Sequence, residues 1–256
     1  MIPPTPHPGN APLRVLAETG HLPDHQYMDR TTLAWIAGNR PTGPGVRATI
    51  PYRPLLLVPE GPWFARREAA DSIHGVRHGA RVALLVQILA HDHDHDHDHD
   101  HGTDPDRTQA LAVAAACHDC RRHHDRDDPG HGQRAARWLA ENTTTVAAAL
   151  GTAPTPEATT AVALHDVAHH AFTDDQTSAY RRHQDAADLL KAADALDRYR
   201  LPLARWWPDP SRLRLPVPVW LHPVAHDLVV HSEQARLDGA TDTQALEHAL
   251  RATLPE

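Results

Sequence analysis

The chain has 256 residues and a formal net charge of −8 when histidine is counted as neutral. This length can bury a substantial core and predicts one domain with extensions rather than two full domains. The negative balance, with arginines interleaved among carboxylates, argues against nucleic acid as a partner. Histidine is the compositional outlier with 23 residues, which favours metal binding because imidazole is the commonest metal ligand in proteins.

The N-terminal residues have neither the basic segment nor the apolar stretch of a secretory signal, and no apolar run is long enough for a membrane span. We therefore expect a cytoplasmic protein without a membrane partner. The two cysteines, Cys117 and Cys120, form a CxxC pair without the second pair of a zinc ribbon or the strand and helix context of a redox motif. Small buried thiols are the better interpretation.

Residues 1–70 are rich in proline and glycine, which predicts a mostly irregular N-terminal extension with room for a strand or two, for example at 53–59. After it, apolar residues between Val82 and Leu89 recur at helical spacing and place His78 on the buried face of a helix. Residues 91–101 alternate histidine and aspartate without an apolar residue. We expect a solvated loop at 91–106, in which metal binding would be incidental.

The rest of the chain predicts further helices, and the fold class is therefore all-α. One helix starts after Thr155, where threonine can cap the first turn and Pro156 can occupy it. It would carry both His165 and His169. The other helices are expected at 107–119, 131–142, 185–200, 222–237 and 243–253, the last with Thr241 or Asp242 as a cap. We divide the chain into the extension 1–70, a helical core 71–205 and a C-terminal helical extension 206–256.

Three of the predicted helices each carry an ionisable residue whose neighbours one turn away are apolar or small. These residues are His78, the pair His118 and Asp119, and Asp194. Buried ionisable groups need partners, and a divalent cation can satisfy imidazoles and carboxylates together. Each residue alone has an ordinary explanation, such as a core histidine with a hydrogen bond or an Asp194 paired with Arg198.

The order of these residues resembles the HD-domain superfamily of metal-dependent phosphohydrolases. The match runs from His74 to Arg200 and rests on HGVRHGARV, on ACHDCRRHHDRDDPGHGQRAARWL and on LLKAADALDRYRL. The resemblance implies an HD-domain-like helical bundle that binds metal through His78, His118, Asp119 and Asp194. A lone His-Asp dipeptide carries no such weight, because it recurs in the tract and at two later places.

Some members of the superfamily hold two metal ions through two additional histidines between the His-Asp pair and the final aspartate. His131 and His165 occupy the corresponding places here, and His169 is a rival to His165. With one metal ion, His131 and His165 would instead contact the substrate phosphate or the leaving group.

Positively charged residues near these positions are expected to face phosphate, because guanidinium groups bind its oxygens in a fork and an ammonium group acts as a compact charge. The candidates are Arg121, Arg122 and Lys191. Of the catalytic residues, Asp119 would ligate or bridge metal, Arg122 and Lys191 would bind phosphate, and a neighbouring histidine or aspartate would transfer protons. His74, His123, Asp125 and Asp127 are nearby residues without an assigned role.

The resemblance therefore implies an enzyme, a hydrolase of a small phosphate ester or anhydride, nucleotide-like molecules included, in which metal activates a water. The cofactor would be one or two divalent ions of Mn, Fe, Co, Ni, Zn or Mg. Two alternatives remain open. The same six ligands would suit an HD-type di-iron oxygenase that oxidises a small molecule, and the His-Asp tract would suit a non-catalytic metal-binding protein.

Overall fold

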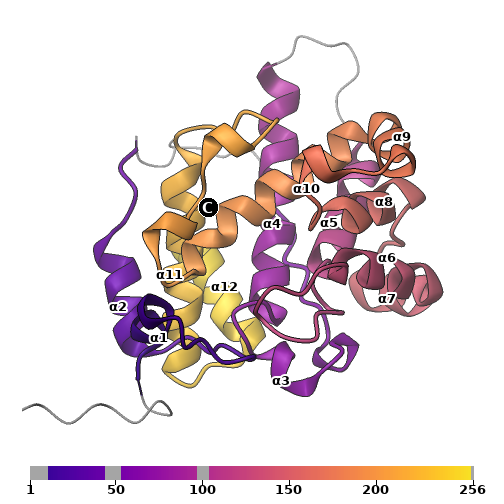
Figure 1. The fold of residues 1–256 in the computed structure, drawn as a ribbon. Coiled ribbons are helices and arrows are strands. Elements are labelled where there is room, and N and C mark those ends of the chain that lie inside the picture. Colours follow the sequence, from indigo (N-terminus) through magenta and orange to yellow (C-terminus); the bar gives the residue numbers. More distant parts are fainter. Residues whose placement is uncertain (1–10, 44–52, 97–103, 255–256) are drawn as a thin grey trace, which may run out of the picture.

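The computed structural model describes residues 11–43, 53–96 and 104–254. Every regular element within these ranges is a helix, which confirms the all-α class (Figure 1). In chain order the α-helices are α1 (Leu13–Thr19), α2 (Arg30–Gly38), α3 (Arg67–Ala70), α4 (Val76–Asp96), α5 (Pro105–Ala116), α6 (His131–Glu141), α7 (Thr143–Leu150), α8 (Pro156–Leu164), α9 (Asp174–Arg182), α10 (Gln184–Asp197), α11 (Leu221–Leu237) and α12 (Asp242–Thr253). Short 3-10 helices lie at η2 (Gly61–Trp63), η3 (His169–Ala171), η4 (Arg198–Arg200), η5 (Ala204–Trp206) and η6 (Pro210–Arg212).

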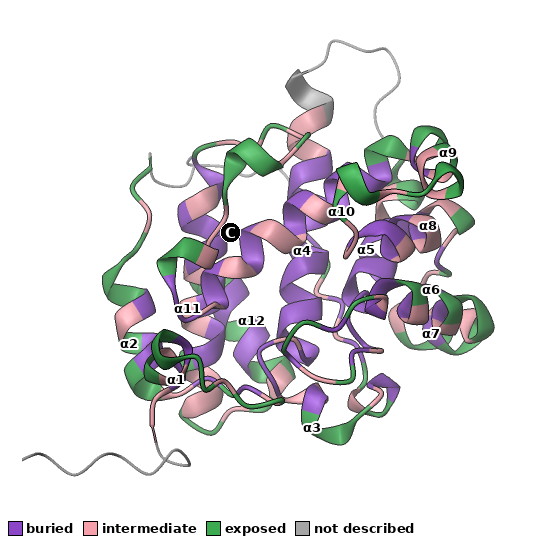
Figure 2. Cartoon of the chain, viewed as in Figure 1, coloured by how far each residue is buried: buried purple, intermediate pink, exposed green. Residues whose placement is uncertain are grey.

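The helix α4 is the centre of the fold. It packs against α5 and α10 on one side and against α11 and α12 on the other, and α10 crosses it in Figure 1. The predicted apolar face from Val82 to Leu89 is buried throughout, as the continuous purple of α4 in Figure 2 shows. Burial of these side chains is the main stabilising contribution of the helix, and it fixes which way His78 points.

The His-Asp tract does not begin with a loop, as the sequence analysis expected, because α4 continues through Asp96. A helix that is already nucleated by a packed segment is extended at low cost, even by residues of modest helix propensity. Residues 97–101 of the tract lie outside the described residues.

The helices α4 and α5 approach closely at a glycine. A Cβ atom on Gly79 would lie 2.2 Å from the carbonyl oxygen of Ala116, so only glycine fits there. The predicted helix 107–119 ends earlier than expected, at Ala116, and His118 and Asp119 lie in the turn that follows. This contact brings the turn next to His78, one residue before Gly79.

The helix α8 starts as predicted, with the Thr155 side chain accepting a hydrogen bond from the Ala158 N–H and Pro156 in the first turn. It stops at Leu164, which corrects the prediction of one helix carrying both His165 and His169. The ammonium group of Lys191 binds the carbonyl oxygens of His165 and Val167 at 2.9 and 2.7 Å. A continued helix would need these carbonyls for its own hydrogen bonds, so His169 lies in the separate η3.

The N-terminal extension contains two helices, α1 and α2, and Asp29 caps α2 by accepting from the Thr32 N–H. No strand forms in the described part of the extension, which corrects the strand expected at 53–59. There the Gln87 side chain binds both the N–H and the carbonyl of Leu55, at 2.8 and 2.9 Å. A helix side chain thereby takes the hydrogen bonds that a neighbouring strand would make.

The two C-terminal helices match the prediction, and Thr241 caps α12 with a full capping box. They pack on each other and on α4. The division of the chain at residues 71 and 206 stays a prediction. Among the described helices, none combines the length and the apolar character that crossing a bilayer would require.

Candidate metal centre

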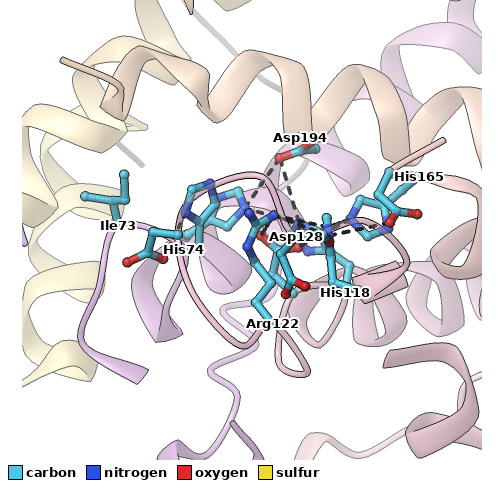
Figure 3. A network of polar contacts seen from close by, with 12 residues as sticks. Ile73, His74, His118, Arg122, Asp128, His165 and Asp194 are labelled. Carbon is cyan, nitrogen blue, oxygen red and sulfur yellow. Dashed lines mark hydrogen bonds and ion pairs between the residues drawn. The ribbon is translucent and has the colours of Figure 1, made fainter. Parts of the chain in front are cut away.

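The six predicted ligands come together in one cluster at the junction of α4, the turn after α5, α6, α8 and α10. Five of them are buried, and the Asp194 side chain is 29% exposed. In Figure 3, Asp194 projects from α10 above the group, towards His118. The cluster contains His78, His118, Asp119, His131, His165 and Asp194.

One half of the cluster surrounds His78. Its Nε2 atom lies 3.1 Å from His118 Nε2, 3.5 Å from Asp119 Oδ2 and 3.4 Å from Asp194 Oδ1. His118 Nε2 lies 3.8 Å from the same Asp194 oxygen. Two imidazoles and two carboxylates thus present one donor atom each to a common space, and three of these residues form a group that can hold a metal ion.

The other half surrounds the second oxygen of Asp119. Asp119 Oδ1 lies 3.0 Å from His131 Nε2 and 3.3 Å from His165 Nε2, and the two histidine nitrogens are 3.0 Å apart. These three residues form the second group that can hold a metal ion. Asp119 belongs to both groups, because its Oδ2 lies near His78 and its Oδ1 lies near His118, His131 and His165.

Hydrogen bonds at the far side of each imidazole fix its tautomer. The Nδ1 atoms of His118, His131 and His165 each lie 2.7 Å from the carbonyl oxygen of the residue three positions earlier. A carbonyl oxygen only accepts, so each Nδ1 carries the proton. His78 Nδ1 likewise lies 2.7 Å from Asp197 Oδ2.

Four Nε2 lone pairs therefore point at one another and at two carboxylates in a buried space. Such an arrangement is repulsive unless protons or a cation lie between the atoms. Nitrogen and carboxylate oxygen are the donors that Mn, Fe, Co, Ni and Zn ions accept. Histidine ligands held by a hydrogen bond at the second nitrogen are typical of metal sites. The residues fit a divalent metal.

The pKa shifts of the two carboxylates are consistent with metal binding. Burial by itself would raise the pKa of Asp119, but His118, Arg122 and His131 hold it well below its ordinary value. Burial would also raise the pKa of Asp194, and a hydrogen bond with His118 lowers it well below the usual range. Both carboxylates are therefore ionised, which is the form that ligates a cation.

The histidines differ in their response to burial. Burial acts to lower the pKa of His118 and His131, but the nearby Asp119 outweighs it and raises both values. For His165, burial prevails and the pKa is lowered. The raised pKa values favour protons on His118 and His131, and a cation would compete with these protons.

A buried ionic network behind His78 was missed by the sequence analysis. Asp197 accepts from His78 and also from Arg81, with Arg81 Nε 2.6 Å from Asp197 Oδ1. Arg81 Nη1 lies 2.8 Å from Glu233 Oε1 on α11, and Glu233 also binds Arg77. Asp197 and Arg81 each lie one helical turn after a predicted ligand, which was the available signal.

A cavity of about 290 Å³ opens onto the cluster. Asp119, His131, His165 and Asp194 line it on the metal side. Its other walls contain three guanidinium groups, one carboxylate, one imidazole and one apolar side chain. These residues are Arg122, Arg198, Arg200, Asp166, His74 and Leu201.

Two of these guanidinium groups lie in contact with the cluster or within reach of its cavity. Arg122 Nη1 lies 3.2 Å from His131 Nε2 and 3.7 Å from Asp119 Oδ2, so this predicted phosphate ligand is in place beside the cluster. Arg200 is 3% exposed, donates from Nε to the Ile73 carbonyl, and has a buried Nη1 without a hydrogen-bond partner. The nearest carboxylate oxygen to this Nη1 atom is Asp197 Oδ2, at 3.6 Å, which is an ion pair but not a hydrogen bond.

The other predicted cations are used differently. Arg121 donates to the Trp63 carbonyl at 3.1 Å and is not part of the cavity wall, so the structure directs it away from the cluster. Lys191 holds the carbonyls of His165 and Val167 and thereby positions the His165 turn. Burial lowers the pKa of Lys191 to about 8.

The remaining candidates also have definite places. His74 lines the cavity rather than the ligand cluster, and its Nδ1 atom lies 3.0 Å from Asp125 Oδ1. Figure 3 shows His74 to one side of Asp194 and His118. His169, the rival to His165, lies 3.3 Å from Asp188 and packs on Tyr180, away from the cluster. Cys117 and Cys120 are buried free thiols, and burial raises the pKa of both.

Comparison with protein-family models, with curated proteins and with solved structures finds no match to this chain. Membership of the HD-domain superfamily therefore stays a prediction that rests on the motifs. What the chain possesses is an all-α fold with a buried cluster of histidines and aspartates that can hold metal.

Proposed function

We propose that this protein is a metal-dependent phosphohydrolase that cleaves a phosphate ester or anhydride. The observation that carries the proposal is the arrangement of four Nε2 atoms around the two oxygens of Asp119, each imidazole fixed by a hydrogen bond from Nδ1. It supports one or two divalent ions at the cluster. The order of the residues along the chain is also the order that the HD-domain resemblance implies.

Divalent ions bound there would polarise a phosphoryl oxygen and lower the pKa of the attacking water. The protein itself supplies charge and position. Arg122 and Arg200 line the cavity, and their guanidinium groups would bind a phosphate there. Asp119 holds both halves of the cluster together, and Lys191 keeps His165 turned towards it.

The guanidinium groups distinguish this proposal from an HD-type oxygenase. Both activities would use the same six ligands, but a wall with Arg122, Arg198 and Arg200 favours a phosphorylated substrate. The two are separable by measurement. Phosphate release without oxygen, with Mn as the added metal, indicates hydrolysis, whereas oxygen consumption by the iron form indicates oxidation.

Metal analysis of the purified protein and of Asp119→Ala tests the proposal, together with a panel of phosphate esters. Since Asp119 contributes to both halves of the cluster, its removal is expected to lose the core metal and to lower hydrolysis by at least about a thousandfold. Asp175→Ala is the matched control, because Asp175 is an exposed aspartate on α9. Retained core metal and unchanged turnover in Asp119→Ala would refute the proposal.

The tract at 91–101 needs its own control, because it can bind metal without defined geometry. Replacement of His95, His97, His99 and His101 by glutamine keeps the length of the chain. We expect the core metal and turnover to persist in this variant. If all tight metal binding disappears instead, the tract and not the cluster binds the metal, and the protein is a non-catalytic metal-binding protein.

A further inference from the structure

The cavity at the cluster continues into two larger ones, which form two arms of one cleft. Arm one has a volume of about 700 Å³ and shares His74, Arg122, Arg198 and Leu201 with the central cavity. Arm two has a volume of about 530 Å³ and shares His165, Asp166, Asp194 and Arg198 with the central cavity. Each arm is large enough for a small organic group.

The two arms leave the cluster in different directions. In Figure 3, Ile73 and His74, which line arm one, lie on one side of Asp194, and His165, which lines arm two, lies on the other. Arg198 borders the central cavity and both arms. A phosphorus atom at the cluster would thus have open space on two sides.

The segment around η5 forms a wall between the arms. Trp206 lines arm one and Trp207, the next residue, lines arm two, while Arg205 lines both. Arg198 Nε fixes the segment by donating to the Trp206 carbonyl at 2.8 Å. Both tryptophans are half-buried, with Arg205 over the Trp206 ring and Trp207 packed on Trp35 and Tyr199, so each arm has an aromatic wall.

The side chains that line the central cavity carry balanced charges. Three guanidinium groups, on Arg122, Arg198 and Arg200, face three carboxylates, on Asp119, Asp166 and Asp194. The side chains alone therefore give no excess of positive charge. Net positive charge for a phosphate group would therefore come from the divalent ion or ions at the cluster.

We propose that the substrate is a phosphodiester of about dinucleotide size, with one organic group in each arm and the phosphate at the metal cluster. This inference rests on the proposed hydrolase function and narrows its substrate class. The oxygen of water forms a bond to phosphorus, and the P–O bond to one of the two groups breaks. That group leaves as an alcohol or phenol with a proton, and the other remains as a phosphomonoester.

Two blocking variants test the inference. Leu22→Trp places a ring in arm one, and Ala168→Trp, at an exposed position, places one in arm two. Ala140→Trp, on the exposed face of α6 and outside both arms, is the matched control. The substrates are the para-nitrophenyl ester of thymidine monophosphate, a diester, and para-nitrophenyl phosphate, a monoester. Both release the same phenol, and the protein is loaded with Mn.

The diester needs both arms and the monoester needs one. Each blocking variant should therefore lower kcat/KM for the diester by at least about tenfold, whereas at most one of them should affect the monoester. The control should match wild type on both substrates. Wild type should also prefer the diester.

The outcomes separate the two proposals. Hydrolysis of the monoester with little or no diester cleavage would overturn the two-armed substrate and leave the hydrolase standing. Diester cleavage that one blocking variant leaves unchanged would likewise overturn it. If wild type with metal hydrolyses neither ester, the phosphohydrolase function and the substrate inference fail together.

Discussion

Asp197 is the residue on which the orientation of His78 depends. Its carboxylate accepts from His78 Nδ1 at 2.7 Å and from Arg81 at 2.6 Å, and it is fully buried. A carboxylate can only accept, so the His78 proton stays on Nδ1 and the Nε2 lone pair stays directed at the cluster.

We expect Asp197→Asn to weaken metal binding by about 10- to 100-fold. The carboxamide oxygen will turn to Arg81 and its NH₂ to His78, which forces the His78 proton onto Nε2. Calorimetric titration with Mn measures the dissociation constant. Asp188→Asn is the control on the same helix, because Asp188 binds Tyr180 and His169 and not the cluster. Equal affinity of Asp197→Asn and wild type would contradict the tautomer role.

The six residues that the HD-domain resemblance suggested as ligands lie in one cluster. The sequence did not predict the ionic network of Asp197, Arg81 and Glu233 behind this cluster. The Arg81 to Glu233 contact joins residues 152 positions apart, and such a pairing depends on how α11 docks. Arg121 and Arg122 looked equivalent as neighbours in one turn, and only the backbone path after Ala116 decides which one faces the cluster.

At the scale of elements, the separation of α6 and α8 sets the distance between His131 and His165. Gly132 is the point of contact. A Cβ atom there would lie 2.6 Å from the Val162 carbonyl, 2.7 Å from Asp166 Oδ1 and 2.9 Å from His165 Nδ1. The Val162 carbonyl on one side and the His165 imidazole on the other leave no room for a methyl group at Gly132.

Gly132→Ala should therefore destabilise the protein by about 2 kcal/mol, since it forces two packed helices apart. It should also weaken metal binding at the His131 and His165 half of the cluster. Gly38→Ala is the matched control, because a Cβ at Gly38 in α2 meets nothing within 4 Å. That substitution should be neutral or stabilise by up to about 1 kcal/mol. Urea unfolding of both variants measures the difference, and equal stability would disprove the close contact.

The apolar periodicity of the sequence predicted which segments form helices, but it did not predict reliably where each helix ends. The start of α8 followed from Thr155 and Pro156, because a cap is a local interaction. Its end at Leu164 depends on Lys191, which reaches the His165 turn from α10. The extension of α4 into the His-Asp tract likewise depends on the packed helix before it rather than on the tract residues.

At the scale of the whole molecule, the N-terminal extension is tied to the C-terminal helices. Arg40, after α2, binds Asp227 on α11 through two nitrogens, at 2.7 and 2.6 Å. Burial would raise the pKa of Asp227, but the hydrogen bond from Arg40 lowers it from 3.8 to about 2. A lowered carboxyl pKa stabilises the folded state at pH values above the unfolded pKa.

This stabilisation should be complete above a pH of about 4 and should be lost as the pH falls through about 2. Since Arg40 is partly exposed, we expect Asp227→Asn to lower the free energy of unfolding by about 1 kcal/mol near neutral pH. The gap to wild type should close towards pH 2. Chemical denaturation across this range measures it, with the exposed Asp175→Asn as control. A gap that does not depend on pH would exclude the ion pair as its cause.

The contacts of Arg81 with Asp197 and Glu233 also bear on how the protein folds during its synthesis. A ribosome releases the N-terminal part first, and domains fold as their residues emerge. When α4 and α10 have left it, Arg81 has Asp197 as a partner, but Glu233 has not yet been synthesised. A buried arginine with half of its carboxylate partners is costly. The support of His78 is thus completed only after α11 has docked, and we expect metal capture to follow the end of synthesis.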